Sequence, residues 1–101
     1  MLRTEIIKNK HIGVLENTDR LNATIAQEIK EQLTDALILG EYNLTLDLSN
    51  IRFIDSTGIG VLISALKTSR QNEGSFKLKS VQKEVMSLLA LMKLDKVFDF
   101  V

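Results

Sequence analysis

The sequence predicts an α/β protein: a mixed, mostly parallel β-sheet that opens with a β-hairpin and packs against helices. Two observations support this fold class. Along the chain, short segments of alternating hydrophobicity, typical of strands, are followed by segments whose apolar residues recur every three or four positions, typical of helices. Strands connected through helices pair in parallel by right-handed crossovers. With 101 residues, the chain has the size of one domain, so we expect residues 1–101 to form a single unit.

The opening hairpin is predicted from two β-rich segments, residues 3–8 and 12–16. The short connection Asn9–His11 between them suits a tight turn. From Asn22 onward, apolar residues follow the helical period, and Gly40 stands where a helix C-terminal glycine belongs. We therefore expect a helix of about four turns between Asn22 and Gly40.

The middle of the chain predicts a second strand–helix unit. Residues 44–48 alternate as a strand, and a weaker strand signal over residues 51–54 runs into a turn at Asp55–Gly58. A second helix is predicted from Thr57 to about Gln71. Residues 53–60 thus place a strand end, a polar turn and a helix start in succession.

The last third repeats this order after a turn signal at Asn72–Gly74. Residues 75–79 alternate as a short strand. Ser80 is expected to cap a third helix whose apolar stripe ends near Met92. Residues 97–101 close the chain as a final strand or helix end.

Composition excludes several classes of function. The chain is 45% hydrophobic and 26% charged, as globular domains are, and its 13 basic and 13 acidic residues cancel. Without a basic surface field, neither nucleic acid nor a membrane surface is an expected partner. There is no cysteine and only one histidine, His11, so we expect no metal site, no cofactor and no enzymatic activity. The N-terminus lacks an export signal, and the longest uncharged stretch, Ser56–Leu66, is too short to span a bilayer, which favours a cytoplasmic protein.

The most informative motif is Asp55-Ser56-Thr57-Gly58-Ile59-Gly60, at the predicted start of the second helix. The unpaired N–H groups of a first helical turn, together with the macrodipole, favour an anion there, so a phosphate on Ser56 would be well placed. It would add about −1.5 to −2 charges beside Asp55. The alternatives are that Ser56 and Thr57 only cap the helix, and that Asp55 is a cap or an acceptor carboxylate.

The second helix also has an unusually wide apolar arc, of roughly 200°, whereas a surface helix needs about half of that. The arc is formed by Ile59, Val61, Leu62, Ile63, Ala65 and Leu66. We expect part of it to remain free for a partner. Gly58 and Gly60 leave the first turn without side-chain bulk, which would let a partner come close.

Taken together, Leu46–Ser49, Phe53–Leu62, the Gly74 turn with Phe76–Leu78, and Val97-Phe98 resemble the STAS domain of bacterial anti-sigma factor antagonists. The resemblance covers nearly the whole chain and implies a single STAS domain. In that family the serine directly after the aspartate is phosphorylated by the cognate anti-sigma factor, an ATP-dependent serine kinase. The resemblance therefore implies that Ser56 is the phosphoacceptor, that ATP is bound by the partner kinase, and that a serine phosphatase acts on phosphorylated Ser56.

The family's Asp-x-x-Thr-Ala segment corresponds to Asp19–Ala23, where Asn22 replaces the usual threonine and can still cap the following helix. Residues 16–18 and 93–94 also depart from the family pattern. The expected partner-binding residues are Asp19, Arg20, Leu21, Asn22, Asp55, Ser56, Thr57, Gly58, Ile59, Gly60 and Ile63.

Two functions stay open on the sequence. In the first, the unphosphorylated domain binds an anti-sigma factor kinase and releases a sigma factor, and phosphorylation on Ser56 reverses the binding. In the second, the domain is a STAS scaffold or ligand-sensing module of a larger bacterial signalling assembly. A serine hydrolase is disfavoured, because the Gly-x-Ser-x-Gly motif is absent and His11 alone could act as base.

Overall fold

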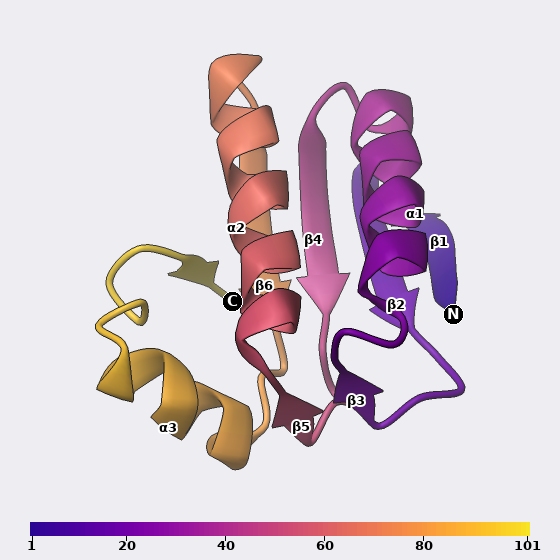
Figure 1. The fold of residues 1–101 in the computed structure, drawn as a ribbon. Coiled ribbons are helices and arrows are strands. Elements are labelled where there is room, and N and C mark those ends of the chain that lie inside the picture. Colours follow the sequence, from indigo (N-terminus) through magenta and orange to yellow (C-terminus); the bar gives the residue numbers. More distant parts are fainter.

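The computed structural model describes all residues from 1 to 101 and has a five-stranded sheet with helices on one face (Figure 1). The sheet has the order β1-β2-β4-β6-β7, in which only β1 and β2 are antiparallel. Its strands are β1 (Leu2–Ile7), β2 (Lys10–Leu15), β4 (Asn43–Asp47), β6 (Ser75–Lys79) and β7 (Asp99–Phe100). The predicted mixed, mostly parallel sheet with an N-terminal hairpin is confirmed.

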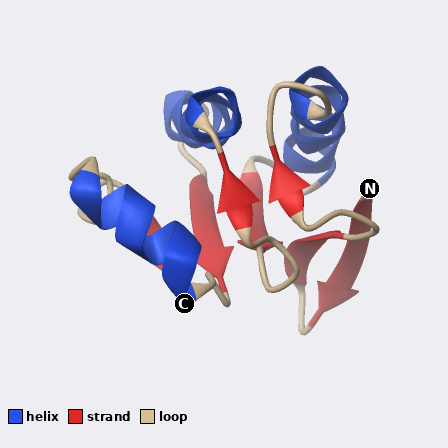
Figure 2. Ribbon diagram, turned by 60° about the horizontal axis from the view of Figure 1, so that its bottom comes forward, coloured by secondary structure: helices blue, strands red, loops and turns tan.

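Three helices complete the fold: α1 (Ala26–Leu39), α2 (Ser56–Gln71) and α3 (Lys83–Leu91). Helices α1 and α2 lie side by side across the sheet, and α3 lies beyond α2 (Figures 1 and 2). None of the three is both long and apolar enough to cross a membrane. The largest fully buried side chains fill the space between sheet and helices and include Leu15, Ile29, Leu33, Leu37, Leu46, Leu62, Phe76 and Leu78.

The hairpin turn lies one to two residues earlier than predicted. Ile7 pairs with Lys10, so the turn consists of Lys8 and Asn9. Their φ angles are 51° and 66°, in the left-handed region. Two-residue turns with both central residues at positive φ match the twist of the flanking strands, which is why the connection is this short.

Helix α1 begins four residues after Asn22, so the prediction that Asn22 caps it was wrong. The Asn22 side chain instead accepts a hydrogen bond from the Thr24 N–H (3.1 Å) and closes a turn that precedes the helix. Ile25 is the N-cap residue and offers no side-chain acceptor. Gly40 does end the helix, but for reasons of space: a Cβ there would lie 2.5 Å from the Asn43 carbonyl oxygen.

Helix α3 is not capped by Ser80, because that residue has a φ of 56° and Gln82 is the N-cap. The predicted strand at the C-terminus is confirmed in part: β7 covers Asp99–Phe100 and pairs in parallel with β6.

The apolar arc of α2 is almost entirely used inside the molecule. Because α2 packs against both α1 and the sheet, it needs a wider apolar surface than a helix that covers one layer. Its members Ile59, Val61, Leu62, Ala65 and Leu66 are buried. Only Ile63 is half-exposed, so the expectation of a broad free apolar arc was wrong.

Candidate functional site

The candidate site lies where a small second ladder feeds into α2. Strand β3 (Arg20–Leu21) pairs in parallel with β5 (Phe53–Ile54), apart from the main sheet. Figure 2 shows these two short strands side by side, each leading toward one of the two large helices. The ladder therefore brings residues 19–22 next to the start of α2.

Backbone hydrogen bonds fix this arrangement. The carbonyl oxygen of Asp19 accepts from the N–H groups of Arg52 (2.7 Å) and Phe53 (3.1 Å), and that of Leu21 accepts from Asp55 N–H (3.3 Å). On the outer surface, the Arg20 guanidinium lies 5.1 Å from the centre of the Phe53 ring. A guanidinium at that distance is attracted by the ring's negative face, which holds the two strands together from outside.

Asp55 caps α2 and ties two loops together with one carboxylate. Its Oδ1 accepts from the Gly58 N–H (2.8 Å), and its Oδ2 accepts from the Ala23 N–H (3.2 Å). The alternative that Ser56 and Thr57 are the caps is therefore wrong, because they are the first two residues inside the helix. Since both oxygens of Asp55 are engaged, its position fits a structural cap better than an acceptor carboxylate.

Ser56 is exposed at the first position of α2, and its hydroxyl makes no hydrogen bond within the chain. The Asp55 cap satisfies the Gly58 N–H and leaves those of Ser56 and Thr57 without an intrachain acceptor. Free N–H groups and the positive end of the macrodipole therefore lie beside the Ser56 side chain. This local arrangement favours a negatively charged group at this position.

Three of the expected partner-binding residues are buried. Leu21 and Ile59 belong to the core, and Gly58 lies beneath the β3–α1 segment, where a Cβ would be 2.2 Å from the Leu21 carbonyl oxygen. In the free chain these three residues therefore expose no side chain to a partner. They support the surface from below.

The remaining expected residues form what we call the Ser56 face. Its exposed members are Asp19, Arg20, Asp55, Ser56, Thr57 and Gly60, and Asn22 is half-buried. Ile63, one turn beyond Gly60 on α2, is half-exposed and borders this face.

A hollow of about 220 Å³ lies between α1 and the start of α2 and is bordered by Thr57, the neighbour of Ser56. It is lined by Ala26, Gln27, Lys30, Thr57, Gly60 and Val61. At Gly60 a Cβ would meet no atom within 4 Å, so this glycine leaves the hollow open. Sequence reasoning missed Gln27 and Lys30. Their three-residue spacing puts them on one helical face, but only the packing of α1 on α2 directs that face toward Thr57 and Gly60.

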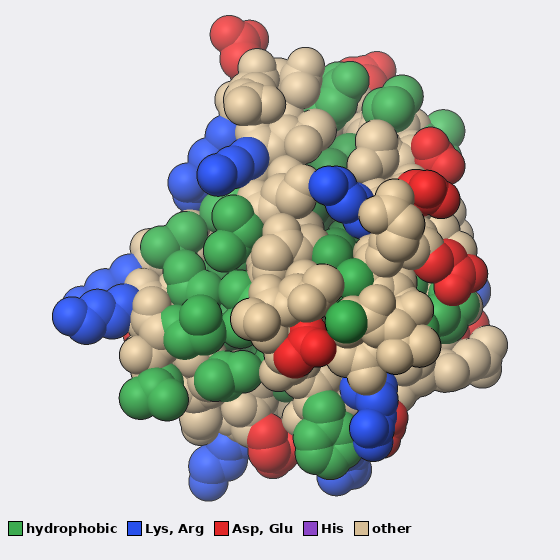
Figure 3. Space-filling model, viewed as in Figure 1, with side chains coloured by type: hydrophobic (Ala, Val, Ile, Leu, Met, Phe, Trp, Pro, Cys, Tyr) green, Lys and Arg blue, Asp and Glu red, His purple; other side chains and the backbone are tan.

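Hydrophobic side chains also gather over α2 and α3, to the left of the Ser56 face in Figure 3. Among the large exposed apolar residues are Leu91 and Met92 at the end of α3 and Val97 beyond it.

No group of three His, Asp or Glu side chains lies close enough to hold a metal ion.

The STAS domain model matches residues 3–101 of this chain. The chain belongs to the STAS domain family. A similar sequence is the anti-sigma-B factor antagonist of Bacillus subtilis, 26% identical over 99 residues that cover 90% of each chain. TM1081 of Thermotoga maritima, described as a candidate anti-sigma factor antagonist, is similar in structure, with a TM-score of 0.83 and 28% identity over 98% of this chain and 84% of that one.

The anti-sigma factor antagonist SpoIIAA shares the fold of this STAS domain. Its unphosphorylated form has a TM-score of 0.78 at 14% identity, and the likeness covers 100% of this chain and 88% of that chain. Its phosphorylated form superposes with a TM-score of 0.71 at the same identity, 14%, and covers 100% and 91% of the two chains. The family model and the similar sequences confirm the predicted membership in the family of STAS anti-sigma factor antagonists.

Proposed function

We propose that this STAS domain switches partners through phosphorylation of Ser56. Unphosphorylated, it binds a cognate anti-sigma factor serine kinase through the Ser56 face and frees a sigma factor. Once Ser56 carries a phosphate, the complex separates, and a serine phosphatase restores the binding form. The observation that supports this most is the exposed, unbonded hydroxyl of Ser56 at the start of α2, in the middle of a face that two loops build.

The domain contributes a phosphoacceptor and a surface, while the kinase supplies ATP and the catalytic groups. Ser56 is first in the helix, and its neighbour Thr57 lines the hollow between the helices. A kinase that reaches the Ser56 hydroxyl therefore also covers Thr57, Gly60 and the Lys30 side of the hollow.

Phosphorylation changes the face mainly in charge. A phosphoserine adds about −1.5 to −2 charges and three acceptor oxygens. The N–H groups of Ser56 and Thr57 donate to no acceptor within the chain, so they are free to donate to those phosphate oxygens, and the fold tolerates the group. The existence of a phosphorylated form of SpoIIAA is compatible with this tolerance.

The phosphate destabilises the complex with the partner rather than the free domain. A dianion enclosed by a docked surface loses its water, and an uncompensated polar group alone costs several kcal/mol in such a setting. Each 1.4 kcal/mol lowers affinity about tenfold, so we expect phosphorylation to lower the affinity for the kinase by two or more orders of magnitude.

The test uses the full chain with each candidate anti-sigma factor kinase of the source cell, in the presence of ATP. Phosphopeptide mass spectrometry should place the phosphate on Ser56, and calorimetry should show loss of binding after modification. The Ser56→Ala variant should remain unlabelled and bound, while the matched Thr57→Ala control should be labelled normally. Undiminished labelling of Ser56→Ala, or equal affinity of the two forms, would favour a scaffold without a phosphorylation switch.

A further inference from the structure

Strand β1 is an outer edge of the main sheet and pairs only with β2. Ile7 and Lys10 close a two-residue turn, so they exchange both backbone hydrogen bonds, and the alternate residues Glu5 and Arg3 do the same farther along. The Glu16 N–H continues the series by donating to the Met1 carbonyl oxygen (2.6 Å).

The even-numbered residues of β1 consequently direct their backbone N–H and C=O groups away from the sheet. These residues are Leu2, Thr4 and Ile6. The Leu2 N–H donates to the side chain of Gln32 on α1 (3.0 Å), which covers one end of the edge. The central part around Thr4 is open.

Beyond the Gln32 contact at Leu2 and the charges of Arg3 and Glu5, this edge lacks the usual protection against strand pairing. Native sheets blunt their edges with prolines, bulges or inward-pointing charges. The chain has no proline, and β1 pairs with β2 without a bulge. Ile6 on the edge is 63% exposed and has the same strand parity as Leu2 and Thr4, which line a hollow of about 220 Å³ beneath α1. Leu39 lines the same hollow and is 65% exposed.

We propose that two copies of this chain associate through their β1 strands, antiparallel about Thr4, so that the two sheets become one. Only pairings of even with even residues satisfy the outward backbone groups. With Thr4 opposite Thr4 of the second copy, Leu2 faces Ile6 of the second copy on the helix side, which joins apolar side chains beside the hollow under α1.

The charges select this register. On the other face of the sheet, the Thr4-centred pairing puts Arg3 opposite Glu5 of the second copy, in a non-hydrogen-bonded pair where side chains are closest. The two neighbouring registers place Arg3 opposite Arg3 or Glu5 opposite Glu5, and like charges in direct opposition are destabilising. The β1 strand is therefore self-complementary in charge and in apolar contacts only when Thr4 is at the centre.

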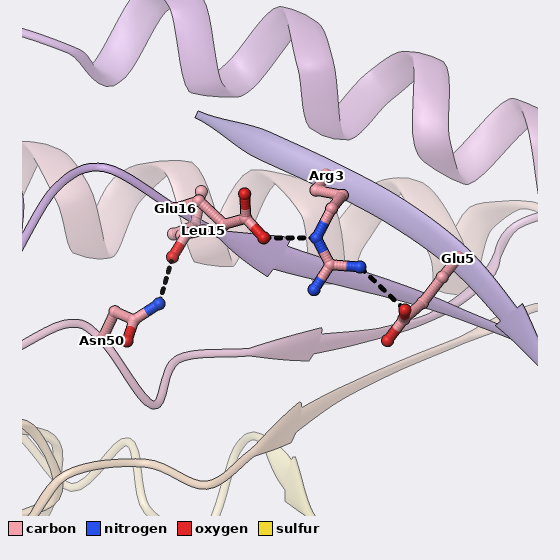
Figure 4. A network of polar contacts seen from close by, with 5 residues as sticks. All are labelled: Arg3, Glu5, Leu15, Glu16 and Asn50. Atoms are coloured by element: carbon pink, nitrogen blue, oxygen red, sulfur yellow. Dashed lines mark hydrogen bonds and ion pairs between the residues drawn. The ribbon is translucent and has the colours of Figure 1, made fainter.

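Within one copy, Arg3 already contacts two carboxylates on this face (Figure 4). Its Nη1 donates to Glu5 (2.7 Å), and its Nε donates to Glu16. The hydrogen bonds that Arg3 donates to Glu16 and Glu5 raise the pKa of Arg3 above its already high value. A guanidinium has five N–H donors, so Arg3 can contact a carboxylate of the second copy and keep Glu16.

Pairing through β1 leaves the Ser56 face free. In Figure 1, α1 separates the β1 edge from the start of α2, so the dimer would present two Ser56 faces at once. The inference goes beyond the proposed function, and each can fail without the other.

Sedimentation equilibrium tests the proposal over about 10 μM to about 1 mM of the unmodified chain, a range suited to a small interface. We expect a reversible dimer. Arg3→Glu and Glu5→Arg should each weaken it about tenfold or more, because each variant opposes like charges at both symmetric positions. An equimolar mixture of the two variants should associate again, since one strand is then acidic and the other basic at positions 3 and 5.

Two further variants separate strand pairing from other contacts. Thr4→Pro should abolish association while the domain stays folded, because the lost N–H points outward and bonds nothing within the sheet. Lys96→Glu, a charge reversal on an exposed loop residue, should leave it unchanged. A monomer at about 1 mM, or a dimer that is insensitive to Thr4→Pro and to both β1 charge reversals, would overturn the proposal.

Discussion

Gly58 and Gly60 lie two residues apart on α2, yet the structure predicts opposite effects for the same substitution. In Gly58→Ala, the new Cβ would lie 2.2 Å from the Leu21 carbonyl oxygen and 2.9 Å from a side-chain carbon of Ile54. Carbon–oxygen contacts are normally above 3 Å, so the β3–α1 segment must retreat by about 1 Å. That movement strains the bonds from Asp55 N–H to Leu21 (3.3 Å) and from Ala23 N–H to Asp55 (3.2 Å).

Three contributions determine the change in unfolding free energy. Overpacking costs about 1–3 kcal/mol, and two weakened hydrogen bonds add about 2 kcal/mol. Replacing glycine by alanine in a helix returns about 1 kcal/mol, so Gly58→Ala should lose about 2–4 kcal/mol of unfolding free energy. Gly60→Ala has only the favourable contribution, because no atom lies within 4 Å of its Cβ, and should gain up to about 1 kcal/mol.

Urea unfolding followed by far-UV circular dichroism measures both variants against the unmodified chain. Thermal unfolding gives a second measurement: in a domain of this size 1 kcal/mol moves the melting temperature by about 4–8 °C, so a difference of about 2–5 kcal/mol should separate the two variants by at least about 8 °C. Equal shifts, or a Gly58→Ala protein as stable as the original, would refute the packing described for Gly58. Gly60→Ala should nonetheless weaken kinase binding, since its methyl group enters the hollow beside Thr57.

Substitutions at three other positions test separate parts of the fold and face. Asp55→Ala should lose about 2 kcal/mol in urea unfolding, because it removes the cap and the tie to Ala23, whereas Asp55→Asn should lose less by keeping one acceptor. Gly74→Ala should lower the unfolding free energy by at least about 2 kcal/mol, because its Cβ would be 1.9 Å from the Tyr42 carbonyl oxygen, and an unchanged urea midpoint would contradict this. Ser56→Asp adds one charge where a phosphate adds about −1.5 to −2, so calorimetry should show weaker kinase binding than for the unmodified chain but tighter binding than for the phosphorylated form.

Hydrophobic period was sufficient to predict strands β1, β2, β4 and β6 and the three helices, because these elements are long enough to show their repeat. The β3–β5 ladder was not predictable in this way. A two-residue strand such as Arg20–Leu21 has no period of its own and exists because the loop is pinned at Asp19 and Leu21. The weak strand signal over residues 51–54 contained β5, but strand β3 and its pairing with β5 were missed.

Roles within the site depended on tertiary contacts. Asp, Ser and Thr all favour N-cap positions, so sequence alone could not decide which of Asp55, Ser56 and Thr57 caps α2. Likewise, Gly58 and Gly60 look equivalent in the sequence, and only the crossing of the β3–α1 segment buries the first and leaves the second open. Lys30 became a candidate because α1 packs against α2, a contact that spans the core.

The bridge that Asp55 makes between Ala23 and Gly58 has a consequence for the thermodynamics of recognition. Ordering a mobile loop on binding costs roughly 1–2 kcal/mol per residue in backbone entropy, which lowers affinity before any contact forms. Here the two loops are joined in the free protein, so a partner meets a surface whose conformational entropy was already lost during folding. Complex formation should therefore show a small ordering penalty, and hydrogen exchange at the Ala23 and Gly58 amides should slow together rather than separately.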